Sequence, residues 1–208
     1  MPVIVVVCTA NVCRSPLAAA ILDAGLRSSY PGTLTLLSAG TAVRDEQELC
    51  ASTVRQLAAR RIPGYVAERS RAGQLDTGLV DTADLILTAD TAQRAIVAQL
   101  STAARSRTFT LREATYLLEG AARLRASEPE PLDFSESVER LNTLRATIVT
   151  PGSGRGRGFG GPGRRRHPLD IVDGHHKGPK SHADVVHEVT AAAEELSRLL
   201  REDAAVPV

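Results

Sequence analysis

Residues 3 to 7 read VIVVV, an uninterrupted apolar run close to the start of the chain. A strand with one face in water alternates apolar and polar residues, so a run without polar positions predicts a strand that is buried on both faces. Such strands belong to parallel sheets covered by helices on both sides. This run therefore constrains the chain toward an α/β fold.

Further apolar runs alternate with helical patterns along the rest of the chain. The sequence predicts strands at residues 33–39, 84–89 and 107–111, and helices after residue 16 and at 46–60, 91–99, 112–126, 134–149 and 181–200. In the helix at 46–60, Leu49, Thr53, Val54 and Leu57 are expected to share one apolar face. The alternation of strands and helices predicts a parallel sheet with helices on both faces.

Composition limits the kind of protein that this chain can be. With 208 residues and 43% apolar content, it can bury the core of a single domain. The formal net charge is +1, which does not favour nucleic acid or a membrane surface as a partner. Three cysteines, an N-terminus without a basic leader and the lack of a run of roughly 20 apolar residues predict a cytoplasmic protein.

One segment stands apart in composition. Residues 151 to 166 contain seven glycines and five arginines and no acidic residue. A segment of this kind cannot bury apolar surface, so we expect a flexible loop, with contact to an acidic substrate or nucleic acid as the less favoured alternative. The expected organisation is one domain over residues 1–208, with an extended insertion and this Gly/Arg-rich loop at about 112–166.

The segment CTANVCRS, residues 8 to 15, lies between the first strand and a helix that Pro16 helps to begin. In open parallel sheets, ligands bind at the carboxyl ends of the strands, where Cys8 is placed. Backbone N–H groups of the loop and the positive end of the helix dipole favour a phosphate there. Arg14 would add a bidentate cation, and Ser15 a hydrogen bond to the sulfur. These neighbours favour the thiolate of Cys8, the nucleophilic form.

With its surroundings, this segment resembles the phosphate-binding loop of the low-molecular-weight protein tyrosine phosphatases. The resemblance continues in SAGT (38–41), SRAGQL (70–75), ADLILTAD (83–90) and DIVD (170–173). It implies a flavodoxin-like three-layer αβα sandwich with a four-stranded parallel sheet, and hydrolysis of a phosphomonoester through a cysteinyl-phosphate without metal or cofactor. Cys8 would be the nucleophile, Arg14 would clamp the phosphoryl oxygens, and inorganic phosphate would be released.

The same resemblance assigns roles to other positions. Asp173 would be the general acid, and Asp170 a structural aspartate in the same loop. Asn11 would hydrogen-bond Ser38 and hold the loop in shape, while Ser15 would stabilise the thiolate. The substrate-binding positions would be Thr9, Ala10, Asn11, Val12, Cys13 and Ser15. Ser70 stands where many members have a supporting histidine.

The remaining cysteines and histidines receive less specific expectations. Cys13 matches a second cysteine that in many members forms a disulfide with the nucleophile, and simple packing is the alternative. Cys50 is expected to fill space in a helix. His175, His176, His182 and His187 have no thiolate ligands at a recognisable spacing, so the sequence predicts no metal site.

Four functions are compatible with these features. A protein phosphotyrosine phosphatase is favoured. A phosphatase for a small phosphomonoester, such as a biosynthetic intermediate, is the main alternative, because GHHKGP (174–179) replaces the aromatic residues expected after the acid. Arsenate reduction would need further cysteines after Cys50, and the chain has none. A phosphate-binding or redox-sensing module would use Cys8 and Cys13 without turnover.

Overall fold

The computed structural model describes residues 1–30, 34–44, 47–62, 73–124, 132–152, 167–174 and 179–204. Within them, four parallel strands form one sheet in the order β2-β1-β3-β4. The strands are β1 (Val3–Cys8), β2 (Thr35–Gly40), β3 (Leu85–Thr88) and β4 (Thr108–Thr110). The predicted α/β class is therefore confirmed, and each strand lies within two residues of its predicted bounds.

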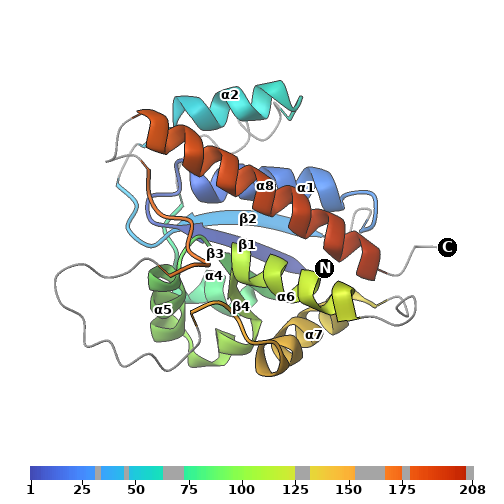
Figure 1. Cartoon of the computed structure of the whole chain (residues 1–208). Coiled ribbons are helices and arrows are strands. Elements are labelled where there is room, and N and C mark those ends of the chain that lie inside the picture. The colour runs from blue at the N-terminus through green and yellow to red at the C-terminus, as the bar shows by residue number, and fades with distance from the viewer. Residues whose placement is uncertain are drawn as a thin grey trace.

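Helices cover both faces of this sheet, as Figure 1 shows. They are α1 (Arg14–Leu26), α2 (Ala51–Ala59), α4 (Thr77–Thr82), α5 (Thr91–Leu100), the 3-10 helix η1 (Thr102–Arg107), α6 (Leu111–Leu124), α7 (Phe134–Thr147) and α8 (Pro179–Asp203). The buried residues of α1, α6, α7 and α8 belong to the core on one face, and those of α4, α5 and η1 to the core on the other. The result is three layers.

Strand β1 shows why the VIVVV run has no polar position. Ile4 and Val6 pack into the core shared with α1 and α8, whereas Val5 and Val7 pack into the core beneath α4 and α5. All four side chains are at most 2% exposed. Successive side chains of a strand point to opposite faces, so only apolar residues at every position fill both cores.

Two helix starts differ from the sequence predictions. Helix α2 begins at Ala51 rather than near residue 46, because the Cys50 backbone is extended and its sulfur accepts a hydrogen bond from the Thr53 amide. Val54 lies on the outer side of this helix at 36% exposed, so the expectation that it shares the buried face is wrong. Helix α1 begins at Arg14, which places Pro16 within the first turn rather than at its first position.

Helices α6 and α7 are part of the main core. Leu117, Leu118 and Leu141 are at most 2% exposed and pack with residues of α1 and α8. Asp133 caps α7 through a reciprocal arrangement with Glu136. Residues 153–166, most of the Gly/Arg-rich segment, lie outside the described residues.

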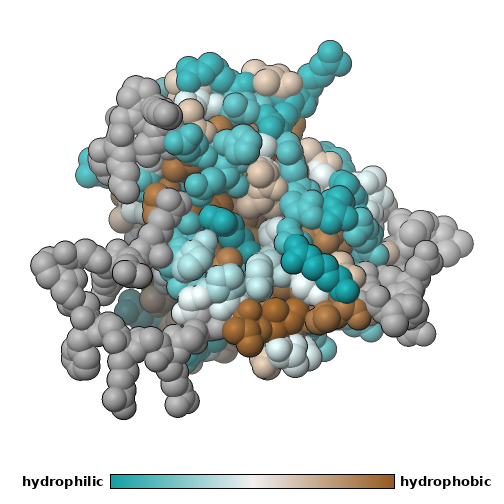
Figure 2. Space-filling model, viewed as in Figure 1, coloured by the Kyte–Doolittle hydropathy of each residue, from teal (hydrophilic) through white to brown (hydrophobic). Residues whose placement is uncertain are grey.

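The surface shown in Figure 2 is mainly polar, and a hydrophobic patch low in that view lies where Figure 1 shows α7 and the end of α6. Among the described residues, no helix combines the length and the apolar character that crossing a membrane would need.

Candidate active site

Cys8 is the last residue of β1, and its side chain is 2% exposed. Its backbone carbonyl accepts a hydrogen bond of 2.9 Å from the Thr41 amide, which joins the end of β1 to the loop after β2. The chain then turns through residues 9 to 13 into α1. The nucleophile candidate therefore lies at the carboxyl end of a central strand, where parallel sheets bind ligands.

The sulfur of Cys8 accepts two hydrogen bonds from its own loop. The Asn11 amide donates over 3.3 Å, and the Ser15 hydroxyl lies 3.0 Å away. A Ser15 hydroxyl hydrogen that donates to the sulfur stabilises a negative charge there, because hydrogen bonds to a charged form favour that form. The Cys8 sulfur is therefore contacted by two donors from residues 11 and 15 of the same segment.

Asn11 gives the loop its shape. Its φ angle is +54°, in the left-handed region where asparagine is better tolerated than most residues. The side chain donates from Nδ2 to the Ser38 carbonyl at 3.1 Å, and its Oδ1 lies 2.9 Å from the Ser15 hydroxyl. The contact that the family resemblance implied between Asn11 and Ser38 is thus present, through the backbone of Ser38.

Gly40, at the end of β2, lets this loop approach the neighbouring strand. A Cβ atom at this position would lie 2.7 Å from the Thr9 carbonyl oxygen and 2.6 Å from a Val43 methyl. Both distances are shorter than real side chains tolerate, so the close approach requires glycine. Within the SAG stretch, Gly40 is therefore required by sterics, and Ser38 accepts the hydrogen bond from Asn11.

Arg14 is 4% exposed and lies in the first turn of α1. One guanidinium nitrogen donates to Asp90 at 3.3 Å and to the Ile171 carbonyl at 3.0 Å. The other donates to the Thr9 hydroxyl at 3.2 Å and to Asp173 at 3.1 Å. A buried guanidinium is held by carboxylates and a carbonyl from separate segments of the chain, so its orientation is fixed.

Asp90 and Gln93 were not identified from the sequence as site residues. Asp90 caps α5 in a reciprocal arrangement with Gln93, and Gln93 also donates to the Thr9 hydroxyl at 3.1 Å. A signal was present, because Asp followed three residues later by Gln, directly after a buried strand, is a capping-box pattern at the carboxyl end of a strand.

The segment with the two candidate aspartates runs along the same edge of the sheet. Asp170 accepts hydrogen bonds from the amide and the hydroxyl of Thr91, at 2.8 and 3.2 Å, which attaches the segment to the start of α5. The Ile171 amide donates to the Ala89 carbonyl at 2.8 Å. Asp173 is partly exposed and paired with Arg14. Asp170 is therefore an anchor, whereas Asp173 faces the loop with an accessible carboxylate.

Cys13 has different neighbours from Cys8. Its sulfur lies 3.2 Å from Nε2 of His182, and the sulfur of Cys50 lies 3.7 Å from the same nitrogen. A hydrogen bond with Cys13 lowers the pKa of Cys50 to about 4, and the same contact together with burial raises the pKa of Cys13. All three cysteines are free thiols. The expectation that no thiol accompanies the histidines is wrong for His182, which is distant in sequence from both cysteines.

The other expected positions have simpler surroundings. Ala10 is half-buried within the loop, and the Val12 carbonyl accepts a hydrogen bond of 2.8 Å from the Cys50 amide. Ser70, His175 and His176 lie outside the described residues. The sequence therefore identified most of the side chains around Cys8 and Arg14 but missed Asp90, which holds Arg14, and Gln93, which holds Thr9.

Comparison with known proteins agrees with this geometry. The model of the family "Low molecular weight phosphotyrosine protein phosphatase" matches residues 3–150. A probable low molecular weight protein-tyrosine-phosphatase, EpsP of Ralstonia nicotianae, is 41% identical over 91 residues, which are 44% of this chain and 57% of that protein. The match thus spans little more than half of the relative's length.

Solved structures show the same fold at low sequence identity. A YwlE mutant from Bacillus subtilis superposes with a TM-score of 0.58 and 18% identity, covering 96% of this chain and 99% of that one. YfkJ from Bacillus subtilis superposes with a TM-score of 0.57 and 16% identity, covering 94% and 92%. Because the family model matches well over half of the chain and includes the Cys8 loop, the chain belongs to the low molecular weight phosphotyrosine protein phosphatase family.

Proposed function

We propose that the protein hydrolyses phosphomonoesters through a phosphocysteine intermediate on Cys8, with protein phosphotyrosine as the substrate class. The observation that supports this most is the pair of hydrogen bonds from Asn11 and Ser15 to the buried Cys8 sulfur. A structural cysteine needs no such donors, whereas a nucleophilic thiolate is stabilised by them.

The first step is attack of the Cys8 thiolate on phosphorus. The S–P bond forms as the bond from phosphorus to the leaving oxygen breaks, and that oxygen takes a proton from Asp173. Arg14 has a planar guanidinium that matches two phosphoryl oxygens, and it would bind them by exchanging its contacts with Thr9 and Asp173 for the phosphoryl group. The N–H groups at the start of α1, where no side chain in the described part of the chain caps the helix, supply further donors.

The second step returns the enzyme to its starting form. Asp173, now a carboxylate, accepts a proton from water as the water oxygen attacks phosphorus. The S–P bond breaks, the thiolate of Cys8 is regenerated, and inorganic phosphate leaves. Ser15 assists here, because its hydroxyl stabilises the sulfur as a leaving group. Atoms and charges balance with water as the only co-reactant.

The relatives support the substrate class to different degrees. EpsP is named as a probable protein-tyrosine-phosphatase, and it is a relative with substantial sequence identity. A YwlE arginine phosphatase shares the fold, but at 18% identity this likeness says nothing about the substrate. A small phosphomonoester remains the second candidate from the sequence, because GHHKGP (174–179) stands where the family resemblance implies aromatic residues.

A substrate panel with a matched blank tests the proposal. We expect the wild-type protein to release phosphate from p-nitrophenyl phosphate and from a phosphotyrosine peptide, and Cys8→Ser to lose both activities. Phosphoserine peptide, phosphoarginine and a set of sugar phosphates complete the panel. Activity in Cys8→Ser equal to that of the wild type would overturn the mechanism, and a preference for sugar phosphates over the peptide would overturn the substrate class.

A phosphoenzyme trap provides a second check. Rapid acid quench of the wild type during turnover should give a protein heavier by one phosphoryl group, with the modification on Cys8 in peptide mass spectrometry. The matched control is Cys50→Ser, which leaves Cys8 in place and should still be phosphorylated. Phosphate on any residue other than Cys8 would contradict the assignment.

A further inference from the structure

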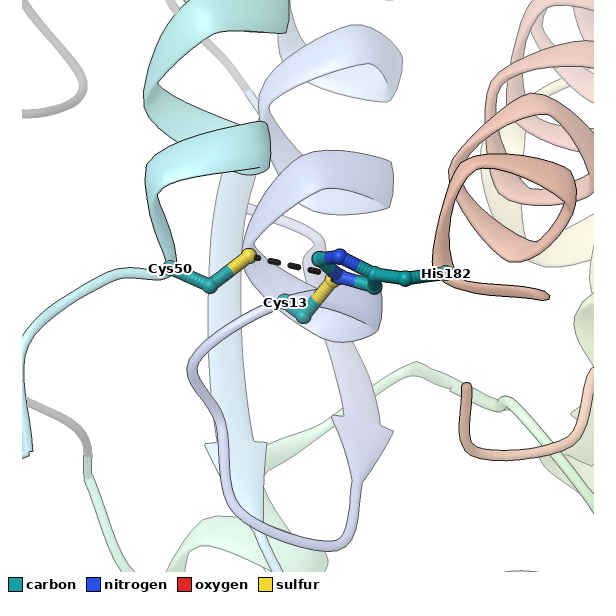
Figure 3. Close-up of side chains that lie close together, drawn as sticks. All are labelled: Cys13, Cys50 and His182. Carbon is teal, nitrogen blue, oxygen red and sulfur yellow. Dashed lines mark hydrogen bonds between the residues drawn. The ribbon is translucent and has the colours of Figure 1, made fainter. Parts of the chain in front are cut away.

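A cluster of three potential metal ligands adjoins the phosphate loop through Cys13, and the three side chains take no part in the proposed hydrolysis. Cys13, Cys50 and His182 each offer one ligand atom, and the three atoms lie within 4.8 Å of one another. Figure 3 shows the side chains converging from the starts of α1, α2 and α8. Residues this far apart in sequence meet only in the folded chain.

The spacing of the ligand atoms suits a tetrahedral zinc ion. With Zn–S bonds of about 2.3 Å and Zn–N bonds of about 2.0–2.1 Å, tetrahedral ligand atoms lie roughly 3.5–3.8 Å apart. The distances from sulfur to Nε2 of His182 are 3.2 Å for Cys13 and 3.7 Å for Cys50, close to that spacing. The third pair, the two sulfur atoms, lies within the 4.8 Å that encloses all three ligand atoms.

Hydrogen bonds to main-chain groups fix the positions of the two cysteines relative to each other. The Cys50 amide donates to the Val12 carbonyl at 2.8 Å, and the Thr53 hydroxyl donates to the Cys13 carbonyl at 3.3 Å. Cys13 and Cys50 are the cap residues of α1 and α2. The positions of the ligands therefore depend on main-chain geometry, which is the rigidity that a preformed metal site requires.

Ser52 completes the surroundings of His182. Its hydroxyl oxygen lies 3.4 Å from Nδ1 of the ring and accepts a hydrogen bond of 2.9 Å from Arg55. When a metal occupies Nε2, the ring proton lies on Nδ1, and the Ser52 oxygen is placed to accept it. Outer-shell acceptors of this kind fix the ring orientation of histidine ligands.

We propose that Cys13, Cys50 and His182 bind one Zn²⁺ ion, with a water molecule as the fourth ligand. Cys13 is buried, whereas Cys50 and His182 are partly exposed, so solvent can reach the open position. Two thiolates and an imidazole select a thiophilic cation over magnesium or calcium. The ion would connect the starts of three helices. One of its ligands, Cys13, directly precedes Arg14 in the sequence.

Cobalt provides the spectroscopic test. We expect reduced wild-type protein, titrated with Co²⁺ in the presence of a phosphine reductant, to bind one equivalent and to show thiolate-to-cobalt charge transfer and strong visible bands of tetrahedral cobalt. Zn²⁺ should displace the colour. Cys50→Ser and His182→Ala should each weaken binding by more than the roughly 10- to 100-fold that loss of an outer-shell partner costs.

Two control variants separate this site from other thiols and histidines. Cys8→Ser removes the candidate nucleophile and should retain the cobalt spectrum. His187→Ala removes an exposed histidine of the same helix and should also retain it. Loss of the spectrum in Cys8→Ser, or a wild type that binds no cobalt, would overturn the proposal. Circular dichroism of the metal-free variants checks that each one folds.

Alkylation of the unmodified chain gives a readout that needs no variant. Zn²⁺ should slow the reaction of iodoacetamide with the partly exposed Cys50, while the reactivity of Cys8 does not change, as measured by peptide mass spectrometry. Equal reactivity of Cys50 with and without Zn²⁺ would contradict the site. Failure of the metal site can be distinguished from failure of the proposed phosphatase activity, because neither the cobalt titration nor the alkylation experiment uses a phosphorylated substrate.

Discussion

The hydroxyl of Ser15 donates a hydrogen bond of 3.0 Å to the sulfur of Cys8 across the phosphate loop. Ser15 is 1% exposed, so no water replaces this donor easily when it is removed. A hydrogen bond to a charged group contributes about 1.5–3 kcal/mol, which corresponds to a factor of roughly 10 to 100. We therefore expect Ser15→Ala to reduce kcat on p-nitrophenyl phosphate by about 10- to 100-fold.

The control for this variant is another buried serine. Ser137 is 1% exposed, and its hydroxyl donates to the Asp133 carbonyl, far from Cys8 in the fold. Ser137→Ala should lower stability without a change in kcat. If Ser15→Ala retained full kcat, or if the two variants lost kcat equally, the hydrogen bond to Cys8 would have no part in catalysis.

Arg14→Lys tests whether the fork geometry of the guanidinium matters rather than its charge. Lysine keeps the positive charge beside Asp90 and Asp173 but cannot donate two parallel hydrogen bonds to phosphate. We expect kcat/KM to fall by roughly 100-fold or more, as for loss of a transition-state donor. Arg140→Lys is the matched control, because Arg140 pairs with a buried Asp203 at 2.9 Å outside the site. It should leave kcat/KM unchanged, and near-normal activity of Arg14→Lys would contradict the clamp.

Asp173→Asn tests the general acid by its dependence on the leaving group. Phenyl phosphate needs a proton on the leaving oxygen, whereas p-nitrophenolate leaves readily without one. We expect the rate of Cys8 phosphorylation, measured in single turnovers, to fall by about 100-fold or more with phenyl phosphate. With p-nitrophenyl phosphate the same rate should fall by less than about tenfold.

Asp170→Asn is the companion variant. Its side-chain oxygen can still accept from the Thr91 amide, so the anchor is weakened rather than lost. The two substrates should then be affected to the same extent. A leaving-group dependence in Asp170→Asn, with none in Asp173→Asn, would reverse the two assignments.

Local patterns in the sequence were sufficient for most of the fold and for the centre of the site. The apolar run before Cys8 has one physical solution, a strand with two covered faces, and the loop motif follows it directly. Contacts made over long sequence separations could not be predicted in this way. Asp90 reaches Arg14 because β1 and β3 are neighbours in the sheet, and sequence order alone does not specify that pairing.

Cys50 and His182 illustrate the same limit. Within its own segment of the chain, each has an ordinary explanation, because a cysteine packs and a histidine lies near the surface. Their meeting with Cys13 depends on how α2 and α8 are placed beside α1, which tertiary packing decides. The predicted start of α2 was wrong for a related reason, because the Cys50 sulfur caps a helix that a propensity pattern extends further.

Gly40→Ala tests the steric requirement of the loop. The added methyl would lie 2.7 Å from the Thr9 carbonyl oxygen, so the phosphate loop or β2 must shift. We expect a loss of about 1–3 kcal/mol in the free energy of unfolding, as for overpacked sites, together with reduced kcat. Gly78→Ala is the control, because a Cβ atom there would have its nearest neighbour at 3.5 Å, an ordinary contact, and alanine favours a helix over glycine by about 0.5–1 kcal/mol. Urea titration should show a lower free energy of unfolding for Gly40→Ala and a higher one for Gly78→Ala than for the wild type. A Gly40→Ala protein as stable as the wild type would contradict the steric argument.

Asp133 provides a pH-dependent contribution to stability away from the site. The Glu136 amide, and then the Ser135 hydroxyl, donate to its carboxylate and lower its pKa below the ordinary value of 3.8. A lowered folded-state pKa stabilises the fold above the unfolded value, and this stabilisation is lost as the pH falls through the folded value. We expect Asp133→Ala to unfold at a lower urea concentration than the wild type at pH 7, with the difference shrinking below pH 4. Asp133→Asn keeps a side-chain acceptor without a charge, so its free energy of unfolding should differ from that of Asp133→Ala by an amount that does not depend on pH. If the difference in stability between the wild type and Asp133→Ala stayed constant down to pH 2, the carboxylate cap would be contradicted.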